Sequence, residues 1–122
     1  MDVRRIILSV LAVSVTACGS TKSATAPSPT TPAGVAVSIP VGARSNSGAA
    51  GFAPNPITVP VGTTVTWTNN DTIAHDVASD SGVWNSNSMA AGAQFSFAFQ
   101  TKGTFPYHCT VHSGMIGTVT VQ

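Results

Sequence analysis

The feature that most constrains this chain is the segment T-F-P-Y-H-C-T-V-H-S-G-M-I-G-T-V-T-V, residues 104–121. In it, Cys109 is followed by His112 three positions later and by Met115 three positions after that. A thiolate, an imidazole and a thioether this close together suit a transition metal better than a hydrolytic triad. The segment is therefore expected to fold so that these three side chains meet at one point.

Blue-copper sites combine two histidines and one cysteine in a plane with a weakly bound axial methionine. The segment provides three of these four ligands, and His75 is available as the other histidine. The order His75, Cys109, His112, Met115 resembles the cupredoxin family, and the C-x-x-H-x-x-M spacing is most similar to its short-loop members such as amicyanin. The alternative interpretation is a buried free cysteine, a surface histidine and a core methionine that happen to be close.

The resemblance covers residues 34–122 and implies an all-β, Greek-key β-sandwich that binds one type 1 copper ion. It also implies that His112 lies nearest the end surface of the domain. The stretch I-T-V-P-V-G-T-T-V-T-W-T-N-N is similar to the cupredoxin strand that leads to the first ligand histidine. The family often has Pro in the C-x-x-H turn and Asn after the first histidine, where this chain has Val111 and Asp76.

The pattern of the residues independently predicts a β-sandwich. Short stretches alternate apolar and polar residues and are separated by Gly and Pro turns, as in all-β domains. Trp67 and Phe95, Phe97 and Phe99 alternate onto strand faces that are expected to be buried. Prolines around residues 57–59 place that strand at a sheet edge. The expected strands are residues 35–39, 57–59, 63–69, 73–78 with His75, 94–99, 104–109 and 117–121.

The first 17 residues predict a lipoprotein signal peptide. Arg4 and Arg5 precede an apolar run over residues 6–15, which is too short to span a bilayer as a helix. V-T-A-C then ends at Cys18, where cleavage and acylation are expected. The alternative is an ordinary secretory signal that ends in small residues.

Residues 18–33 are rich in Ser, Thr, Ala and Pro and predict an extended tether between a membrane anchor and the domain 34–122. If Cys18 carries lipid, Cys109 has no disulfide partner. An unpaired thiol outside the cytoplasm needs a reason, and metal ligation provides one. The predicted location is the bacterial cell envelope, facing the periplasm or the cell exterior.

The small number of charged side chains excludes several classes of function. Residues 34–122 contain only five charged side chains, namely Arg44, Lys102, Asp71, Asp76 and Asp80. No basic patch is available for nucleic acid, and no acidic cluster for hard cations.

The predicted function is transfer of single electrons between transient redox partners by a monomer. Three strong ligands and a weak one leave no open coordination position, so an enzyme is not expected. The alternatives are a protein that stores or delivers copper without redox cycling, and a metal-free sandwich that acts in recognition. Ile116 either contributes to an apolar docking patch around His112 or packs under the loop.

Overall fold

A computed structural model describes residues 33–46 and 48–122 of the chain. The predicted signal peptide, residues 1–17, and the acylation site Cys18 lie outside the described residues, as does all of the predicted tether except Ala33. Within the part that is described, no helix is long and apolar enough to cross a membrane.

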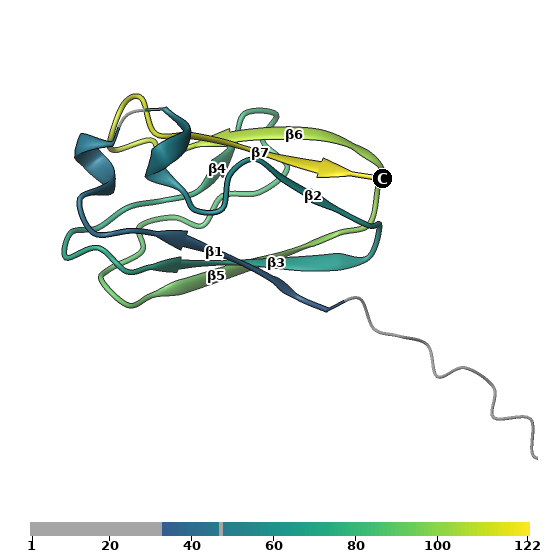
Figure 1. The fold of residues 1–122 in the computed structure, drawn as a ribbon, viewed down its shortest axis with the longest axis horizontal. Coiled ribbons are helices and arrows are strands. Elements are labelled where there is room, and N and C mark those ends of the chain that lie inside the picture. The colour runs from purple at the N-terminus through teal and green to yellow at the C-terminus, as the bar shows by residue number, and fades with distance from the viewer. Residues whose placement is uncertain (1–32, 47) are drawn as a thin grey trace, which may run out of the picture.

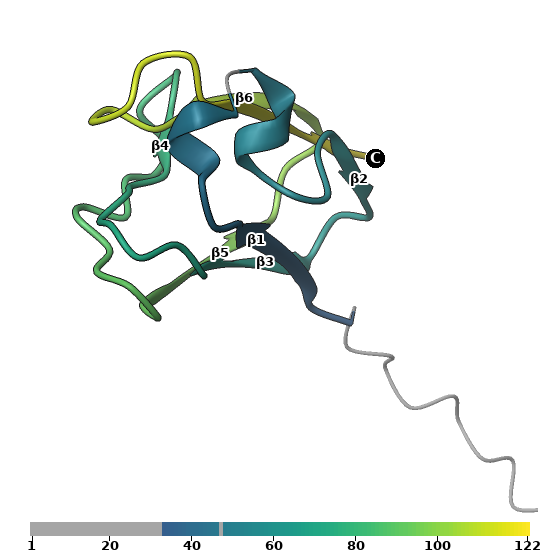
Figure 2. The same cartoon turned by 60° about the vertical axis from the view of Figure 1, so that its left-hand side comes forward.

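Two β-sheets pack face to face in the described domain (Figures 1 and 2). One has the strand order β1-β3-β5 and the other the order β2-β7-β6-β4. The predicted all-β sandwich is therefore confirmed. The strands are β1 (Val35–Ile39), β2 (Ile57–Val59), β3 (Thr63–Asn69), β4 (Ala78–Ser79), β5 (Gln94–Phe99), β6 (Gly103–His108) and β7 (Ile116–Val121), with 3-10 turns η1 (Ala43–Ser45) and η2 (Ala49–Gly51) between β1 and β2.

The space between the sheets is filled by aromatic side chains. Trp67 of β3 is fully buried, and its ring lies 5.8 Å from that of Trp84 and 5.4 Å from that of Tyr107. Phe99 is buried as predicted, whereas Phe95 and Phe97 are partly buried and pack against the same core. Side chains alternate across a strand, so the period-2 pattern of β3 selects which residues enter this core. Trp84 belongs to the core although it comes from a loop.

The outer strands agree with the positions of the prolines. β2 lies at the end of its sheet and pairs only with β7, in parallel. Proline has no N–H to donate to a sheet ladder and is therefore confined to such edges. The predicted edge position of residues 57–59 is confirmed.

The predicted strand over residues 73–78 is wrong. Only Ala78–Ser79 forms a strand, and His75 lies before it in a loop, paired through two backbone hydrogen bonds of 3.1 and 2.7 Å to Met89. The side-chain amide of Asn69 donates to the backbone oxygens of Ile73 and Met89, at 2.8 and 2.9 Å. The Asn69 amide therefore holds the Ile73 oxygen and shares the Met89 oxygen with His75 N–H, and His75 and Met89 meet in an isolated bridge instead of a strand.

Candidate metal centre

The loop between β6 and β7 brings its side chains together because it is short and closed by its own backbone. Cys109 N–H donates to the Met115 oxygen at 3.1 Å, and Met115 N–H donates to the His112 oxygen at 3.4 Å. Gly114 has φ of 91°, a left-handed conformation that glycine adopts at little cost. The chain therefore reverses between Cys109 and Met115 without moving either strand out of register.

Three of the four predicted ligands form a cluster. Cys109 Sγ lies 3.8 Å from His75 Nδ1 and 3.8 Å from His112 Nδ1, and the two Nδ1 atoms are 3.0 Å apart. All three donor atoms lie within 4.8 Å of one another. Metal bonds to imidazole nitrogen and thiolate sulfur are about 2.0–2.3 Å long, so a triangle of this size accommodates one ion at its centre. The residues therefore fit a copper ion.

The cluster is buried except at one edge. His75 is fully buried and Cys109 is 2% exposed, whereas His112 is partly exposed. His112 lines a shallow surface depression together with Arg44, Val111 and Ser113. The ring of His112 is thus the part of the cluster that an approaching molecule can reach, as the family resemblance implied.

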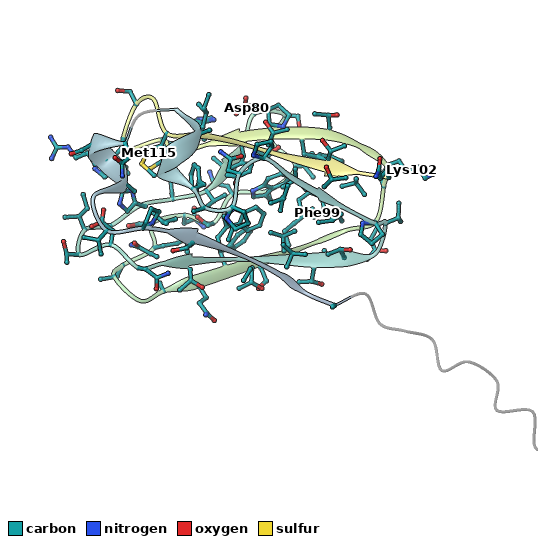
Figure 3. All side chains as sticks on the ribbon, in the orientation of Figure 1. Asp80, Phe99, Lys102 and Met115 are labelled. Atoms are coloured by element: carbon teal, nitrogen blue, oxygen red, sulfur yellow. The ribbon has the colours of Figure 1, made fainter. Side chains whose placement is uncertain are left out.

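Met115 is fully buried at the end of the same loop, and Figure 3 shows it at the end of the domain opposite Lys102. Its side chain packs against Gly51, where an added Cβ would lie 2.9 Å from Met115 Cγ. Gly48 pairs with Met115 as an isolated bridge, and Gly48 N–H donates to the Gly114 oxygen. Gly48 and Gly51, which are distant from Met115 in the sequence, therefore lie against it. Coordination by Met115 stays a prediction.

The remaining histidine lies outside the cluster. His108 Nδ1 is 2.6 Å from Asp80 Oδ1, and both side chains are at the surface, 42% and 48% exposed. Successive side chains on a strand point to opposite faces, so His108 turns away from the side to which Cys109 points.

Asp76 joins the two ligand-bearing loops. Its carboxylate accepts a hydrogen bond from Thr110 N–H at 2.7 Å and another from the Thr110 hydroxyl at 2.5 Å. Burial by itself would raise the pKa of Asp76, but the hydrogen bonds from Thr110 and its neighbours outweigh burial and lower it. Asp76, which stands where the family often has Asn, thus braces the residue that follows Cys109.

A second carboxylate contacts a predicted ligand directly. His75 Nε2 lies 2.9 Å from Asp71 Oδ2, and the two side chains are 0% and 4% exposed. The hydrogen bond from His75 lowers the pKa of Asp71 to about 2. His75 Nε2, the ring nitrogen that does not face Cys109, is therefore hydrogen-bonded to the buried carboxylate of Asp71.

Burial affects the ionisation of the other two ligands in opposite ways as far as metal binding is concerned. Burial raises the pKa of the Cys109 thiol, so a proton must leave before the thiolate can bind a metal. Burial lowers the pKa of His112, which favours the neutral ring that ligates.

Sequence reasoning missed three residues at this site: Asp71, Gly51 and Arg44. From the sequence, Asp71 is only one of five charged side chains in the domain, and Gly51 carries no functional group. A usable signal existed for Asp71, because a domain with three acidic residues places one of them four positions before a candidate ligand. Gly51 and Arg44 carry no comparable local signal, since their partners are distant in sequence.

Comparisons with known proteins point to one family. The sequence profile of the copper-binding proteins of the plastocyanin/azurin family matches residues 39–122. Plastocyanin from Scenedesmus fuscus is 38% identical over 100 residues, covering 70% of this chain and 99% of that protein. Amicyanin from Paracoccus denitrificans is 38% identical over 69 residues, covering 52% of this chain and 53% of that protein.

Solved structures give the same fold. A purple cupredoxin from Nitrosopumilus maritimus aligns with a TM-score of 0.66 and 35% identity, covering 72% of this chain and 99% of that one. A copper-containing nitrite reductase from Thermus scotoductus aligns with a TM-score of 0.61 at 24% identity, over 23% of its own length. At that identity the reductase shares the fold alone.

Proposed function

This chain belongs to the plastocyanin/azurin family of copper-binding proteins, and we propose that it carries single electrons through one type 1 copper ion. The observation that carries the proposal is the buried triangle of His75, Cys109 and His112 donor atoms. Copper, when bound there, supplies the one-electron couple.

The donor set suits both oxidation states of such a couple. Imidazole nitrogens are preferred by Cu(II) and thiolate or thioether sulfur by Cu(I). His75 and Cys109 lie in loops between strands of the two packed sheets, and the hydrogen bonds that Thr110 donates to Asp76 tie these loops together. A site whose ligands are held in place by the fold needs little rearrangement when the electron arrives or leaves.

We assign the weak axial position to Met115. Its side chain is buried in the loop that carries Cys109 and His112, and Gly51 packs against it. With three strong ligands and this thioether, no coordination position stays open for a substrate, which supports an electron carrier over an enzyme.

Electrons would enter and leave at His112, the ligand edge that reaches the surface. Val111 and Ile116 near it are 61% and 55% exposed, so Ile116 does not pack under the loop. Small apolar contact areas suit short-lived redox encounters. Arg44 lines the same depression and would favour a partner with a carboxylate at its own docking edge.

We place the protein in the bacterial cell envelope, held by lipid on Cys18, and we expect it to be a monomer. The signal pattern of residues 1–18 supports this location. β1 runs parallel to β3, and its last residue, Ile39, pairs with Asn69 beside the metal end. The described chain therefore begins at the far end of the sandwich, so an anchored domain would present His112 away from the membrane.

An optical and redox titration of the copper-loaded protein tests the function. We expect an intense thiolate-to-Cu(II) band that disappears on one-electron reduction and returns on reoxidation. Cys109→Ser should bind copper without this band. A protein that binds copper but does not cycle reversibly would instead be one that stores or delivers the metal.

A further inference from the structure

We propose that Asp71 is a positioning residue for the copper site, fixing the ring of His75 and lowering the reduction potential through its negative charge. The proposal rests on the proposed function, because a potential is defined only for a redox-active site. The observation behind it is the buried contact between His75 Nε2 and Asp71 Oδ2 at 2.9 Å.

The contact determines which ring nitrogen can bind a metal. An ionised carboxylate has no hydrogen to donate, so His75 Nε2 must carry the hydrogen of this bond. In the neutral ring, Nδ1 is then left with its lone pair, and it is the nitrogen that lies 3.8 Å from Cys109 Sγ and 3.0 Å from His112 Nδ1. Asp71 thus selects the tautomer of the ring as well as its orientation.

Asp71 is itself held in place. Its Oδ1 accepts a hydrogen bond from Thr72 N–H at 2.7 Å, and its own N–H donates to Asn69 Oδ1 at 3.0 Å. Asn69 also donates to the backbone oxygens of Ile73 and Met89, at 2.8 and 2.9 Å. The carboxylate therefore has a fixed direction, which a partner exposed to solvent would not have.

The charge of Asp71 is not neutralised by a fixed cation. In the described residues the cationic side chains are Arg44, which is exposed, and Lys102, at the far end of the domain (Figure 3). Charges interact more strongly in the protein interior than in water. A buried anion on a ligand ring stabilises Cu(II) more than Cu(I), and its hydrogen bond also makes the imidazole a stronger donor.

Asp71→Asn separates charge from geometry. The Asn carbonyl can still accept the hydrogen bond from His75, so the visible band should remain. Loss of the charge should shift the Cu(II)/Cu(I) equilibrium about tenfold towards Cu(I), which raises the potential by about 59 mV for a one-electron couple. Asp71→Ser removes the same charge with less volume and replaces the Asn variant if that one does not fold.

Asp80→Asn is the matched control. It removes one carboxylate that also bonds a histidine, but this pair is exposed and His108 lies outside the cluster. The reduction potential of the Asp80→Asn variant should equal that of the wild type. If the potential of Asp71→Asn is also unchanged while its band is retained, the role of the charge is disproved.

Two measurements test the positioning role. Asp71→Ala leaves the buried Nε2–H without an acceptor, and copper affinity measured by chelator competition should fall about 10- to 100-fold. In the metal-free wild type, nitrogen NMR should show the hydrogen of His75 on Nε2, and this preference should be lost in Asp71→Ala. The NMR result does not need copper, so failure of the proposed function and failure of this inference are distinguishable. A preference that survives in Asp71→Ala would overturn the positioning role.

Discussion

Met115 and Gly51 illustrate how a single residue adjusts this site. Gly51 lies in segment 42–51, far from the ligands in sequence, yet it provides the space that the Met115 side chain occupies. Buried positions of this kind tolerate added volume poorly, because protein interiors are close-packed. The position of the thioether therefore depends on a residue that has no chemistry of its own.

Gly51→Ala should displace Met115. The added Cβ would lie 2.9 Å from Met115 Cγ and 3.2 Å from its Cβ and Cε. We expect the free energy of unfolding to fall by about 1–3 kcal/mol, and the visible spectrum to change while copper stays bound. The control is Gly34→Ala, whose Cβ would meet only a backbone oxygen at 3.5 Å. Identical spectra for both variants would show that Met115 does not depend on Gly51.

Replacing the thioether itself tests the axial assignment. Met115→Leu should keep a coloured copper site, because the two imidazoles and the thiolate provide the strong bonds. The potential measured by redox titration should rise, since an electron-donating group is lost and Cu(I) is favoured. An unchanged potential would mean that Met115 is not a ligand.

The three histidines give a sharper test of the cluster. His108→Ala should retain copper and the visible band, because its ring contacts Asp80 at the surface. His75→Ala and His112→Ala should each lose the native spectrum. Added imidazole should partly restore the His112 variant but not the His75 variant, since only His112 lies at the surface. Loss of the band in His108→Ala with its retention in His75→Ala would overturn the assignment.

At the scale of elements, the β6–β7 hairpin positions most of the site. Its register pairs His108 with Ile116 and Tyr107 with Gly117, directly below the ligand loop. A Cβ on Gly117 would overlap the Tyr107 ring, so the two strands can keep this spacing only with glycine at that position. Tyr107 in turn packs on Phe52 and Trp67 in the core.

Gly117→Ala should therefore loosen the hairpin. We expect the free energy of unfolding, measured with denaturant, to fall by about 1–3 kcal/mol or more, because overpacking in a closely packed interior forces neighbours to move. The loss of unfolding free energy caused by Gly117→Ala should be smaller in a Tyr107→Leu background, where the ring that the new Cβ would meet is absent. Strictly additive effects would show that Gly117 is not constrained by Tyr107.

At the scale of the whole molecule, the ligand loops and the beginning of the described chain lie at opposite ends of the sandwich. Three exposed apolar residues, Val41, Val111 and Ile116, belong to or adjoin the loops of the metal end. A membrane anchor at the other end would leave that face free to meet redox partners. The proposed lipid anchor and the proposed electron transfer are therefore compatible with each other.

Cys18→Ser tests the anchor. We expect the wild-type protein to carry acyl chains and to partition into the detergent phase, and the variant to lack acylation and to remain in the aqueous phase. Acylation adds about 0.8 kcal/mol of membrane affinity for each buried CH2, and two signals are needed for stable attachment. Mass spectrometry that finds no acyl chain on wild-type Cys18 would disprove the anchor.

The sequence by itself determined the donor types, the sandwich and the close approach of Cys109 and His112. These follow from local rules, because a seven-residue loop brings its own side chains together and strand alternation separates buried from exposed faces. The same alternation correctly turned His108 away from the cluster. Edge placement of residues 57–59 followed from the missing N–H of proline.

Only the tertiary structure decided what surrounds the ligands. His75 lies in an irregular loop instead of a strand, joined to Met89 by an isolated bridge and to the end of β3 through the Asn69 side chain. Asp71 on the far side of the His75 ring and Gly51 beneath Met115 depend on how segments distant in sequence pack against each other. Periodicity and spacing report which face a residue occupies. Periodicity and spacing do not report which atoms of a distant segment that residue contacts. Those contacts form only when the two sheets and their loops pack together.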